Sequence, residues 1–248
     1  MHFYHYCCYD RGDRYEVNQD SLSLQTLMTE KGPVAMALIC DGVGGLRSGE
    51  VAGNLAAKAM TVWFYQSFIP MYFREAGRSV IYKSFQRKLE EVHEQLKEKG
   101  KSEGGSMGTT LTMLLLYDKK YLVFQIGDSG CDVFLQKRKK AFYKTLTSAQ
   151  RNEDGMLLQA IGCGEVPIAE CVWGRQRFDG YFLYSDGLHN TITKKQSEQL
   201  FHIKGHTELL PKRMEELLSR VRRNGEKDNC SGIVLLTVKG GKNHKRRE

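Results

Sequence analysis

The run TTLTMLLLYDKKYLVFQI (residues 109–126) indicates the fold class. Its two apolar parts, residues 109–117 and 121–126, have the length and composition of buried β-strands. The connector at Asp118 and Lys119 is short enough for a hairpin. Strands joined in this way run antiparallel, so we expect an antiparallel sheet here.

Outward from this run, the chain alternates between groups of strands and groups of helices. Helical apolar periodicity marks residues 50–68, 79–99, 193–202 and 208–223. Further strands are expected at residues 3–9, 21–27, 34–40, 132–136, 141–146, 171–178, 181–185 and 233–238. Residues 137–140 and the dipeptide Asp179-Gly180 are expected to turn two more hairpins.

This order of elements argues against a doubly wound parallel sheet, in which helices alternate with single strands. It predicts an α+β fold, a four-layer α/β/β/α sandwich of two antiparallel sheets flanked by helices. No linker or internal repeat divides the sequence. We therefore expect a single domain over residues 1–238 and a flexible basic tail over residues 239–248.

The formal net charge of +8 is concentrated in two short segments. The basic run at 137–140 and the tail at 239–248 account for all of it, which leaves no broad basic face for nucleic acid. The simplest explanation is that the first cluster is a solvated hairpin tip and the second a frayed terminus. The alternative is that they dock to an acidic protein or a membrane surface. No run approaches the ~18 apolar residues of a membrane span, and no secretory signal is visible. We expect a cytoplasmic monomer.

Cysteine and histidine show no ligand pattern. The seven cysteines contain no Cys-x-x-Cys pair and the seven histidines form no His-Glu-x-x-His motif. Reduced thiols are therefore expected, with neither a disulfide framework nor a zinc ribbon. We also expect no nucleophilic cysteine. Any bound metal must be held by oxygen atoms.

Acidic residues stand where apolar strands end or begin. Asp41 and Asp186 each follow an apolar run and precede a glycine, and Asp228 comes shortly before the last strand. Carboxylates at strand ends are held rigidly but stay open to solvent, and a glycine lets its carbonyl approach a ligand closely. Such an all-oxygen set suits Mg²⁺ or Mn²⁺. The alternative is that Asp-Gly only turns the chain.

Seven short motifs then occur in a fixed order. They are Asn18-Gln19-Asp20-Ser21, Asp41-Gly42-Val43-Gly44-Gly45, Gly108-Thr109-Thr110, Gly127-Asp128-Ser129, LQAIG at residues 158–162, Ser185-Asp186-Gly187 and Asp228-Asn229. From about residue 8 to residue 238 the chain resembles the metal-dependent Ser/Thr protein phosphatases (protein phosphatase 2C type, PPM), in their compact bacterial branch. The resemblance implies the same sandwich, with a metal cleft at one end of the two sheets.

The resemblance also implies the metal ligands. Asp41 is expected to bridge two Mn²⁺ or Mg²⁺ ions, and the Gly42 carbonyl to bind the first. Asp186 and Asp228 are expected to complete the second, and Asp128 with Asp186 to hold a third, weaker ion. Two such ions can acidify a water, aim it at phosphorus and neutralise charge on the phosphoryl oxygens.

Three further residues are implied to surround these ligands, namely Gln19, Asp20 and Asn229. The phosphate-binding arginine of the family falls at Tyr15 in this chain. In a regular strand the adjacent Arg14 would face the opposite way. We nevertheless expect Arg14, rather than Arg11, to bind phosphate, because a distortion after Gly12 would turn it inward.

Two other departures concern the surroundings of the cleft. Gly127-Asp128-Ser129 is followed by Gly130 where the family has arginine. The segment between Leu146 and Leu158 is short and lacks the Asp-His-Ser of the family, which predicts a reduced flap.

Together these inferences predict a phosphoserine/phosphothreonine protein phosphatase with catalytic residues Asp41, Asp186, Asp228 and Arg14. Its expected partners are phosphorylated proteins, among them a Ser/Thr kinase and the targets of that kinase. One alternative is a catalytically weak phosphoprotein-binding adaptor, which a lost ligand aspartate would favour. The other is a phosphatase dedicated to one regulatory partner, which the sequence does not distinguish.

Overall fold

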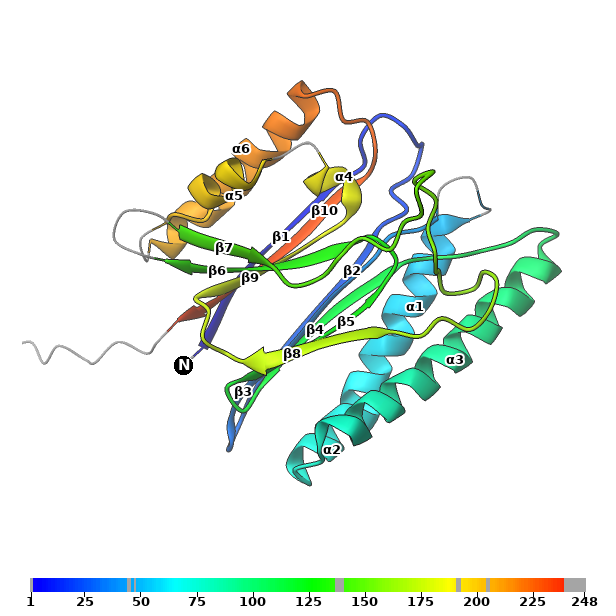
Figure 1. The fold of residues 1–248 in the computed structure, drawn as a ribbon, viewed down its shortest axis with the longest axis horizontal. Helices are drawn as coiled ribbons and strands as arrows, with labels where there is room; N and C mark the ends of the chain where they lie inside the picture. The colour runs from blue at the N-terminus through cyan, green and yellow to red at the C-terminus, as the bar shows by residue number, and fades with distance from the viewer. Residues whose placement is uncertain are drawn as a thin grey trace, which may run out of the picture.

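Two five-stranded sheets pack face to face, and each carries helices on its outer side (Figure 1). The computed structural model describes residues 2–43, 46, 48–136, 141–190, 193–203 and 206–238. The first sheet has the order β1 (His2–Asp10), β10 (Cys230–Val238), β9 (Gly180–Tyr184), β6 (Gly130–Gln136) and β7 (Ala141–Thr145). The second has the order β2 (Ser21–Thr29), β3 (Gly32–Cys40), β4 (Leu111–Tyr117), β5 (Lys120–Ile126) and β8 (Glu170–Arg175).

The helices lie in the two outer layers. One layer contains α1 (Gly49–Trp63), a π-helical turn (Phe64–Phe68), α2 (Ile69–Phe73) and α3 (Arg78–Ser102). The other contains α5 (Lys194–Leu200), a 3₁₀ turn (Thr207–Leu209) and α6 (Leu210–Arg223), and α4 (Asp186–His189) is a single turn after β9. The predicted α/β/β/α sandwich of antiparallel sheets is confirmed.

Strand β3 is buried on both faces, which explains its unbroken apolar sequence. Met36 and Leu38 pack in the cluster that includes α1 and α3, whereas Ala35, Ala37 and Ile39 pack against the other sheet. Because neighbouring side chains of a strand point to opposite faces, a strand buried on both faces needs apolar residues at every position.

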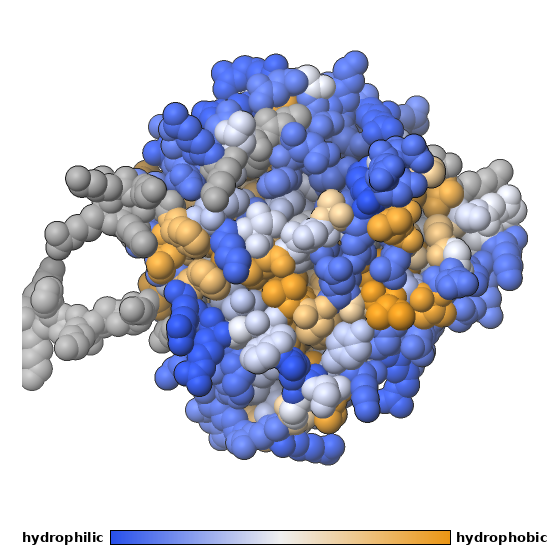
Figure 2. All heavy atoms as spheres, in the orientation of Figure 1, coloured by the Kyte–Doolittle hydropathy of each residue, from blue (hydrophilic) through white to orange (hydrophobic). Residues whose placement is uncertain are grey.

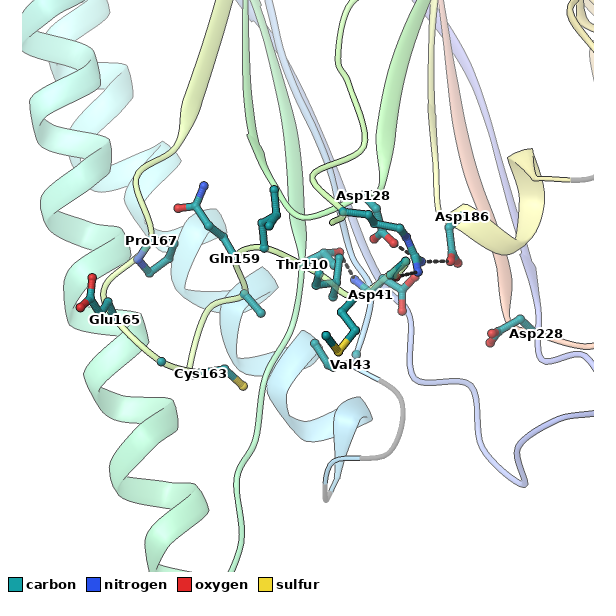
Figure 3. Close-up of a pocket in the computed structure, with 18 of the residues that line it drawn as sticks. Asp41, Val43, Thr110, Asp128, Gln159, Cys163, Glu165, Pro167, Asp186 and Asp228 are labelled. Atoms are coloured by element: carbon teal, nitrogen blue, oxygen red, sulfur yellow. Dashed lines mark hydrogen bonds and ion pairs between the residues drawn. The ribbon is translucent and has the colours of Figure 1, made fainter. Parts of the chain in front are cut away.

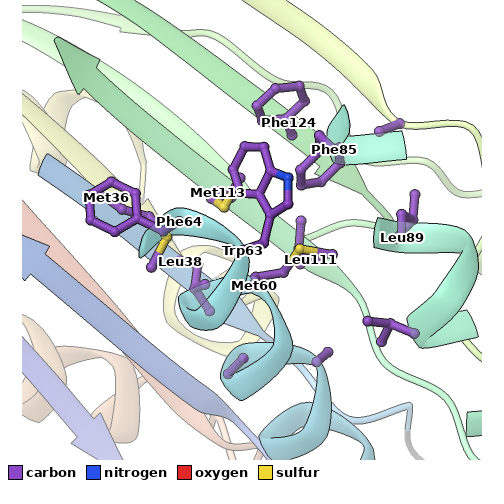
Figure 4. Packing of buried hydrophobic residues seen from close by; sticks show 14 of the residues in the cluster. Met36, Leu38, Met60, Trp63, Phe64, Phe85, Leu89, Leu111, Met113 and Phe124 are labelled. Atoms are coloured by element: carbon purple, nitrogen blue, oxygen red, sulfur yellow. The ribbon is translucent and has the colours of Figure 1, made fainter. Parts of the chain in front are cut away.

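Aromatic rings join the helices to the second sheet (Figure 4). The ring of Trp63 meets the edge of Phe85 at 5.6 Å between centroids, and Phe85 stacks on Phe124 of β5 at 4.0 Å. The indole N–H of Trp63 donates to the Ser84 hydroxyl at 3.1 Å, so its polar atom is satisfied inside the core.

The hairpin between β4 and β5 is confirmed. Asp118 and Lys119 both have left-handed backbones, with φ of 46° and 57°. Two consecutive positive φ values give a turn whose twist matches that of the flanking strands.

The hairpin predicted around Asp179-Gly180 is wrong. Strand β8 pairs with β5 in the second sheet, whereas β9 pairs with β10 and β6 in the first. Asp179 holds the crossing chain against β6, because its N–H donates to the Phe134 carbonyl at 3.0 Å and its carboxylate accepts from the Gln136 N–H at 2.6 Å. These bonds to another strand replace the local turn that the dipeptide predicts.

Two predicted features lie outside the described residues, namely the hairpin tip at 137–140 and the basic tail at 239–248. The antiparallel pairing of β6 with β7 on either side of the tip agrees with the prediction. All seven cysteines are free thiols. In the described part of the chain, no helix is both long and apolar enough to cross a membrane.

Candidate active site

Four aspartates meet at one end of the two sheets. Asp41 follows β3, Asp128 lies between β5 and β6, Asp186 begins α4 directly after β9, and Asp228 shortly precedes β10. All four line one pocket of about 800 Å³. Figure 3 shows Asp41, Asp128 and Asp186 close together at one side of this pocket and Asp228 beyond them.

The backbone of Asp41 is fixed by two threonines. The Thr110 N–H donates to the Asp41 carbonyl at 2.8 Å, and the Asp41 N–H donates to the Thr110 hydroxyl at 3.1 Å. The Thr109 hydroxyl donates to the same carbonyl at 2.9 Å, and a hydrogen bond of 2.9 Å joins the hydroxyls of Thr110 and Ser129. The two motifs at residues 108–110 and 127–129 therefore hold Asp41 in place.

Gly42 sits where no side chain fits. A Cβ at this position would lie 2.6 Å from the carbonyl carbon of Gly49 at the start of α1. The Gly42 N–H donates to the Gln19 carbonyl at 3.2 Å, which ties the loop after β3 to the segment before β2. Gly42 can thus lie against the start of α1, and it lines the pocket.

Asp20, Gln19 and Asn229 do not line the pocket but bond to the segments that carry its aspartates. Asp20 is only 2% exposed and accepts a hydrogen bond of 2.9 Å from the Ser185 hydroxyl, next to Asp186. The Asn229 side-chain carbonyl accepts from the Gln19 N–H at 2.8 Å, beside Asp228. These residues tie the segments before β2, after β9 and before β10 to one another.

Burial and the charges of neighbouring aspartates raise the pKa of Asp41, Asp186 and Asp20. Burial, and then the charges of four other aspartates, raise the pKa of Asp41 well above its usual range. Burial, then Asp128 and Asp228, raise the pKa of Asp186 to about 6, and burial first of all raises the pKa of Asp20 to about 6. The negative charges of these buried carboxylates are therefore not fully compensated by neighbouring positive groups. A bound cation would lower their pKa and favour the ionised form.

Arg14 faces the pocket. Its Nη1 donates to Asp228 Oδ2 at 2.6 Å, and its side chain is 58% exposed. The segment after β1 is not a strand, since Gly12 has φ of +70° and the N–H of Arg14 donates to the Lys227 carbonyl at 2.8 Å. Strand alternation therefore does not apply at Arg14. Arg11 points elsewhere, because its Nη1 donates to the Glu16 carbonyl at 3.1 Å.

Arg151 is a pocket residue that the sequence analysis missed. Its Nη2 lies 2.7 Å from Asp186 Oδ2 and also contacts Asp128 Oδ2. Its Nη1 donates to the Gly155 carbonyl at 2.7 Å. The only signal in the sequence is the position of Arg151 within the short segment that departs from the family's pattern.

Two cysteines have the Cys-x₅-Arg spacing of phosphatases that use a cysteine nucleophile, namely Cys8 with Arg14 and Cys171 with Arg177. Cys8 is 5% exposed within β1, and burial raises the pKa of its thiol to about 12. Cys171 lies in β8, where burial also raises the pKa of its thiol. A thiol that stays protonated is a poor nucleophile.

The other end of the pocket is lined by residues between Gln159 and Ile168, most of which are apolar. Cys163, Glu165 and Pro167 lie at this end, away from the aspartates (Figure 3). Ile168 at this end is 68% exposed. Figure 2 shows that hydrophobic residues form patches among hydrophilic ones on the face in view. The pocket thus combines a charged end with an apolar, solvent-facing end.

The chemistry of the donors fits hard divalent ions. Asp41, Asp186, Asp228 and the Gly42 carbonyl offer only oxygen atoms, which Mg²⁺ and Mn²⁺ prefer. Among the described residues, no three side chains yet converge on a single ion position. Arg14 and Arg151 instead neutralise Asp228, Asp186 and Asp128.

Comparisons with known proteins identify the relatives of this chain. The serine/threonine phosphatase stp of Listeria monocytogenes serotype 4b is 24% identical, over 93% of this chain and 96% of that protein. Stp1 of Staphylococcus aureus has a TM-score of 0.76 at 17% identity, covering 96% of each chain. The catalytic domain of PstP in complex with two manganese ions has a TM-score of 0.70 at 21% identity, covering 96% of this chain and 99% of that one.

The two structural likenesses agree with the predicted fold. The family model described as protein phosphatase 2C matches residues 11–225, which is most of the chain. The order of motifs in the sequence made the same prediction, which is confirmed. The chain therefore belongs to the protein phosphatase 2C family.

Proposed function

We propose that this phosphatase hydrolyses phosphoserine and phosphothreonine on proteins, with a water activated at a centre of two Mn²⁺ or Mg²⁺ ions. The observation that carries the proposal is the meeting of Asp41, Asp186 and Asp228 at one pocket in a chain of this family. Relatives named serine/threonine phosphatases, and a neighbour solved with two manganese ions, support it.

Each residue has a separate task in this proposal. Asp41, the Gly42 carbonyl, Asp186 and Asp228 would hold the ions, which supply an acidified water and neutralise charge on the phosphoryl oxygens. Thr110 keeps Asp41 in position through both backbone bonds. Because these carboxylates are anchored at strand ends, little rearrangement of the backbone is needed on binding.

Arg14 would bind the phosphoryl group. A guanidinium fork matches two phosphate oxygens, and a side chain that is 58% exposed can reach an incoming substrate. Asp228 now accepts from Arg14 and would exchange that partner for a cation. The arginine would then be free to meet the substrate at the same edge of the pocket.

The open pocket suits a phosphate on a protein chain better than a small buried metabolite. Its apolar end could contact residues that flank the phosphorylated side chain. Phosphorylated proteins are therefore the proposed substrates, and a Ser/Thr kinase remains the predicted counterpart. The cytoplasmic location and the monomeric state also stay predictions.

The adaptor alternative loses support from the site. All four aspartates are present in the pocket, and the backbone bonds around Asp41 are complete. The alternative of a phosphatase dedicated to one regulatory partner stays open, because such an enzyme would use the same four aspartates.

The deciding experiment assays the full chain against phosphoserine, phosphothreonine and phosphotyrosine peptides. We expect hydrolysis of the first two with Mn²⁺ or Mg²⁺, loss of activity in EDTA and recovery when Mn²⁺ is restored. Full activity in excess chelator would contradict the metal mechanism. Tight binding of the phosphopeptides without turnover would favour the adaptor.

A further inference from the structure

Arg151 occupies the space in which a cation shared by Asp128 and Asp186 would have to bind. One nitrogen, Nη2, contacts Oδ2 of both carboxylates. The Asp128 side chain is 4% exposed and that of Asp186 is 21% exposed, so solvent screens these charges only partly. The guanidinium is thus the counter-charge that both carboxylates share.

The position of Arg151 is built into the fold. Gln150, the preceding residue, is 8% exposed, and it binds Gly127 twice: its side-chain oxygen accepts from the Gly127 N–H at 2.8 Å, and its own N–H donates to the Gly127 carbonyl at 3.1 Å. Gly127 directly precedes Asp128. These bonds therefore hold the backbone of Arg151 next to the loop that carries Asp128.

The far end of the same segment closes back on Arg151. Arg151 forms a β-bridge with Leu157, the N–H of Leu158 donates to the Gln150 carbonyl at 2.9 Å, and Nη1 of Arg151 donates to Gly155. Among the described residues, Arg14 is 58% exposed and contacts the carboxylate of Asp228. Arg151 is 39% exposed and contacts the carboxylates of both Asp128 and Asp186. The two arginines therefore differ in how firmly they are held.

A divalent ion and this guanidinium exclude one another. An ion shared by Asp128 and Asp186 needs the inward oxygens of both residues, and Arg151 uses Oδ2 of each. Binding the ion would also place two more positive charges beside a guanidinium, which stays protonated in proteins. The residues as arranged therefore do not fit the third ion that the family resemblance implies.

We propose that Arg151 is a built-in replacement for the third metal ion, so that the protein binds two divalent ions and no third. The proposal rests on the proposed function for the two ions themselves. Arg151 acts as a positioning residue, since it fixes Asp186, one of the proposed ligands. In this proposal the two tightly bound ions suffice for catalysis without a third, weakly bound ion. Activity should therefore saturate once both tight sites are filled.

The test counts bound ions rather than turnover. Mn²⁺ is titrated into the full chain to millimolar free concentration, and free Mn²⁺ is measured by its electron paramagnetic resonance signal. We expect two bound ions in the wild type. Arg151→Met keeps the length of the side chain but removes its charge and donors, and we expect it to bind a third, weak ion. The double variant Arg151→Met/Asp128→Asn should return to two.

Arg14→Ala is the matched control, because it also removes a guanidinium from a pocket carboxylate. We expect it to stay at two ions. Four results would each overturn the role proposed for Arg151 and leave the proposed function intact. They are three bound ions in the wild type, two in Arg151→Met, three in the double variant, and three in Arg14→Ala. Absence of tight Mn²⁺ binding in the wild type would overturn the proposed function, and this inference with it.

Discussion

The two ends of the pocket are built in opposite ways. At the charged end, Asp41 is fixed through its N–H and its carbonyl, and Asp20 behind it is 2% exposed. At the apolar end, Ile168 lies on the surface and is 68% exposed. The carboxylates of the charged end lie at or near the ends of strands, whereas the apolar end belongs to the long connection between β7 and β8.

This difference separates two tasks. Reaction chemistry needs carboxylates at fixed positions, and strand ends in a packed sandwich supply them. Contacts with varied substrates need an adaptable surface, and exposed side chains on a connection supply it. Substitutions at the two ends should therefore affect different measured quantities.

Asp41→Asn should have the largest effect. It removes a charge from the proposed bridging position but keeps the size of the side chain, so the fold should survive. We expect kcat on a phosphopeptide to fall by roughly 10²- to 10³-fold, the scale seen when one electrostatic stabiliser of a transition state is lost. Steady-state kinetics and circular dichroism check this. A variant with near wild-type kcat would remove Asp41 from the mechanism.

The metal-free protein should lose stability as pH rises from about 4 to about 7. The pKa of Asp186 is about 6 in the folded chain, above the value of 3.8 for an unperturbed carboxyl. The folded state thus holds the extra proton in this range, and its loss costs up to about 3 kcal/mol of unfolding free energy.

Urea unfolding in EDTA at several pH values measures this loss. Asp186→Asn should give a shallower dependence than the wild type, and Mn²⁺ should restore stability at neutral pH because it binds the folded chain. An equal slope in both proteins would show that burial and the neighbouring carboxylates do not raise the pKa of Asp186 in the folded chain.

Arg14→Ala should act more weakly and on a different constant. The grip on phosphate exists before the transition state as well as in it, so KM for phosphopeptides should rise about 10-fold, with kcat less affected. Arg11→Ala is the matched control, since Arg11 bonds to a carbonyl of its own loop. Loss of affinity in Arg11→Ala, with Arg14→Ala unchanged, would transfer the phosphate contact to Arg11.

Ile168→Ser should have the smallest effect. Ile168 is 68% exposed, so its loss should change stability by less than ~1 kcal/mol. We expect KM for phosphopeptides to rise only a few-fold, and kinetics on a small aryl phosphate, which has no flanking residues, to stay at wild-type values. A large fall in kcat on the aryl phosphate would mean that the two ends of the pocket are not independent.

Much of the fold could be predicted because it follows from local pattern. The unbroken apolar run before Asp41 marks a strand buried on both faces, and the short connector at Asp118 and Lys119 leaves only a hairpin. The partner of β8 could not be predicted in this way. Asp179 has the local signal of a turn, but its bonds to Phe134 and Gln136 are long-range contacts.

The same division holds for the site. The positions of Asp41, Asp186 and Asp228 near strand ends can be predicted from the amino-acid sequence, because strand patterns and chain order are local properties. The directions of the two arginine side chains depend on tertiary contacts. Arg14 turns inward through a bond to Lys227, and Arg151 is placed by the bonds of Gln150 to Gly127, both far away in the chain. Side-chain direction in a loop depends on such distant partners, which a local pattern does not contain.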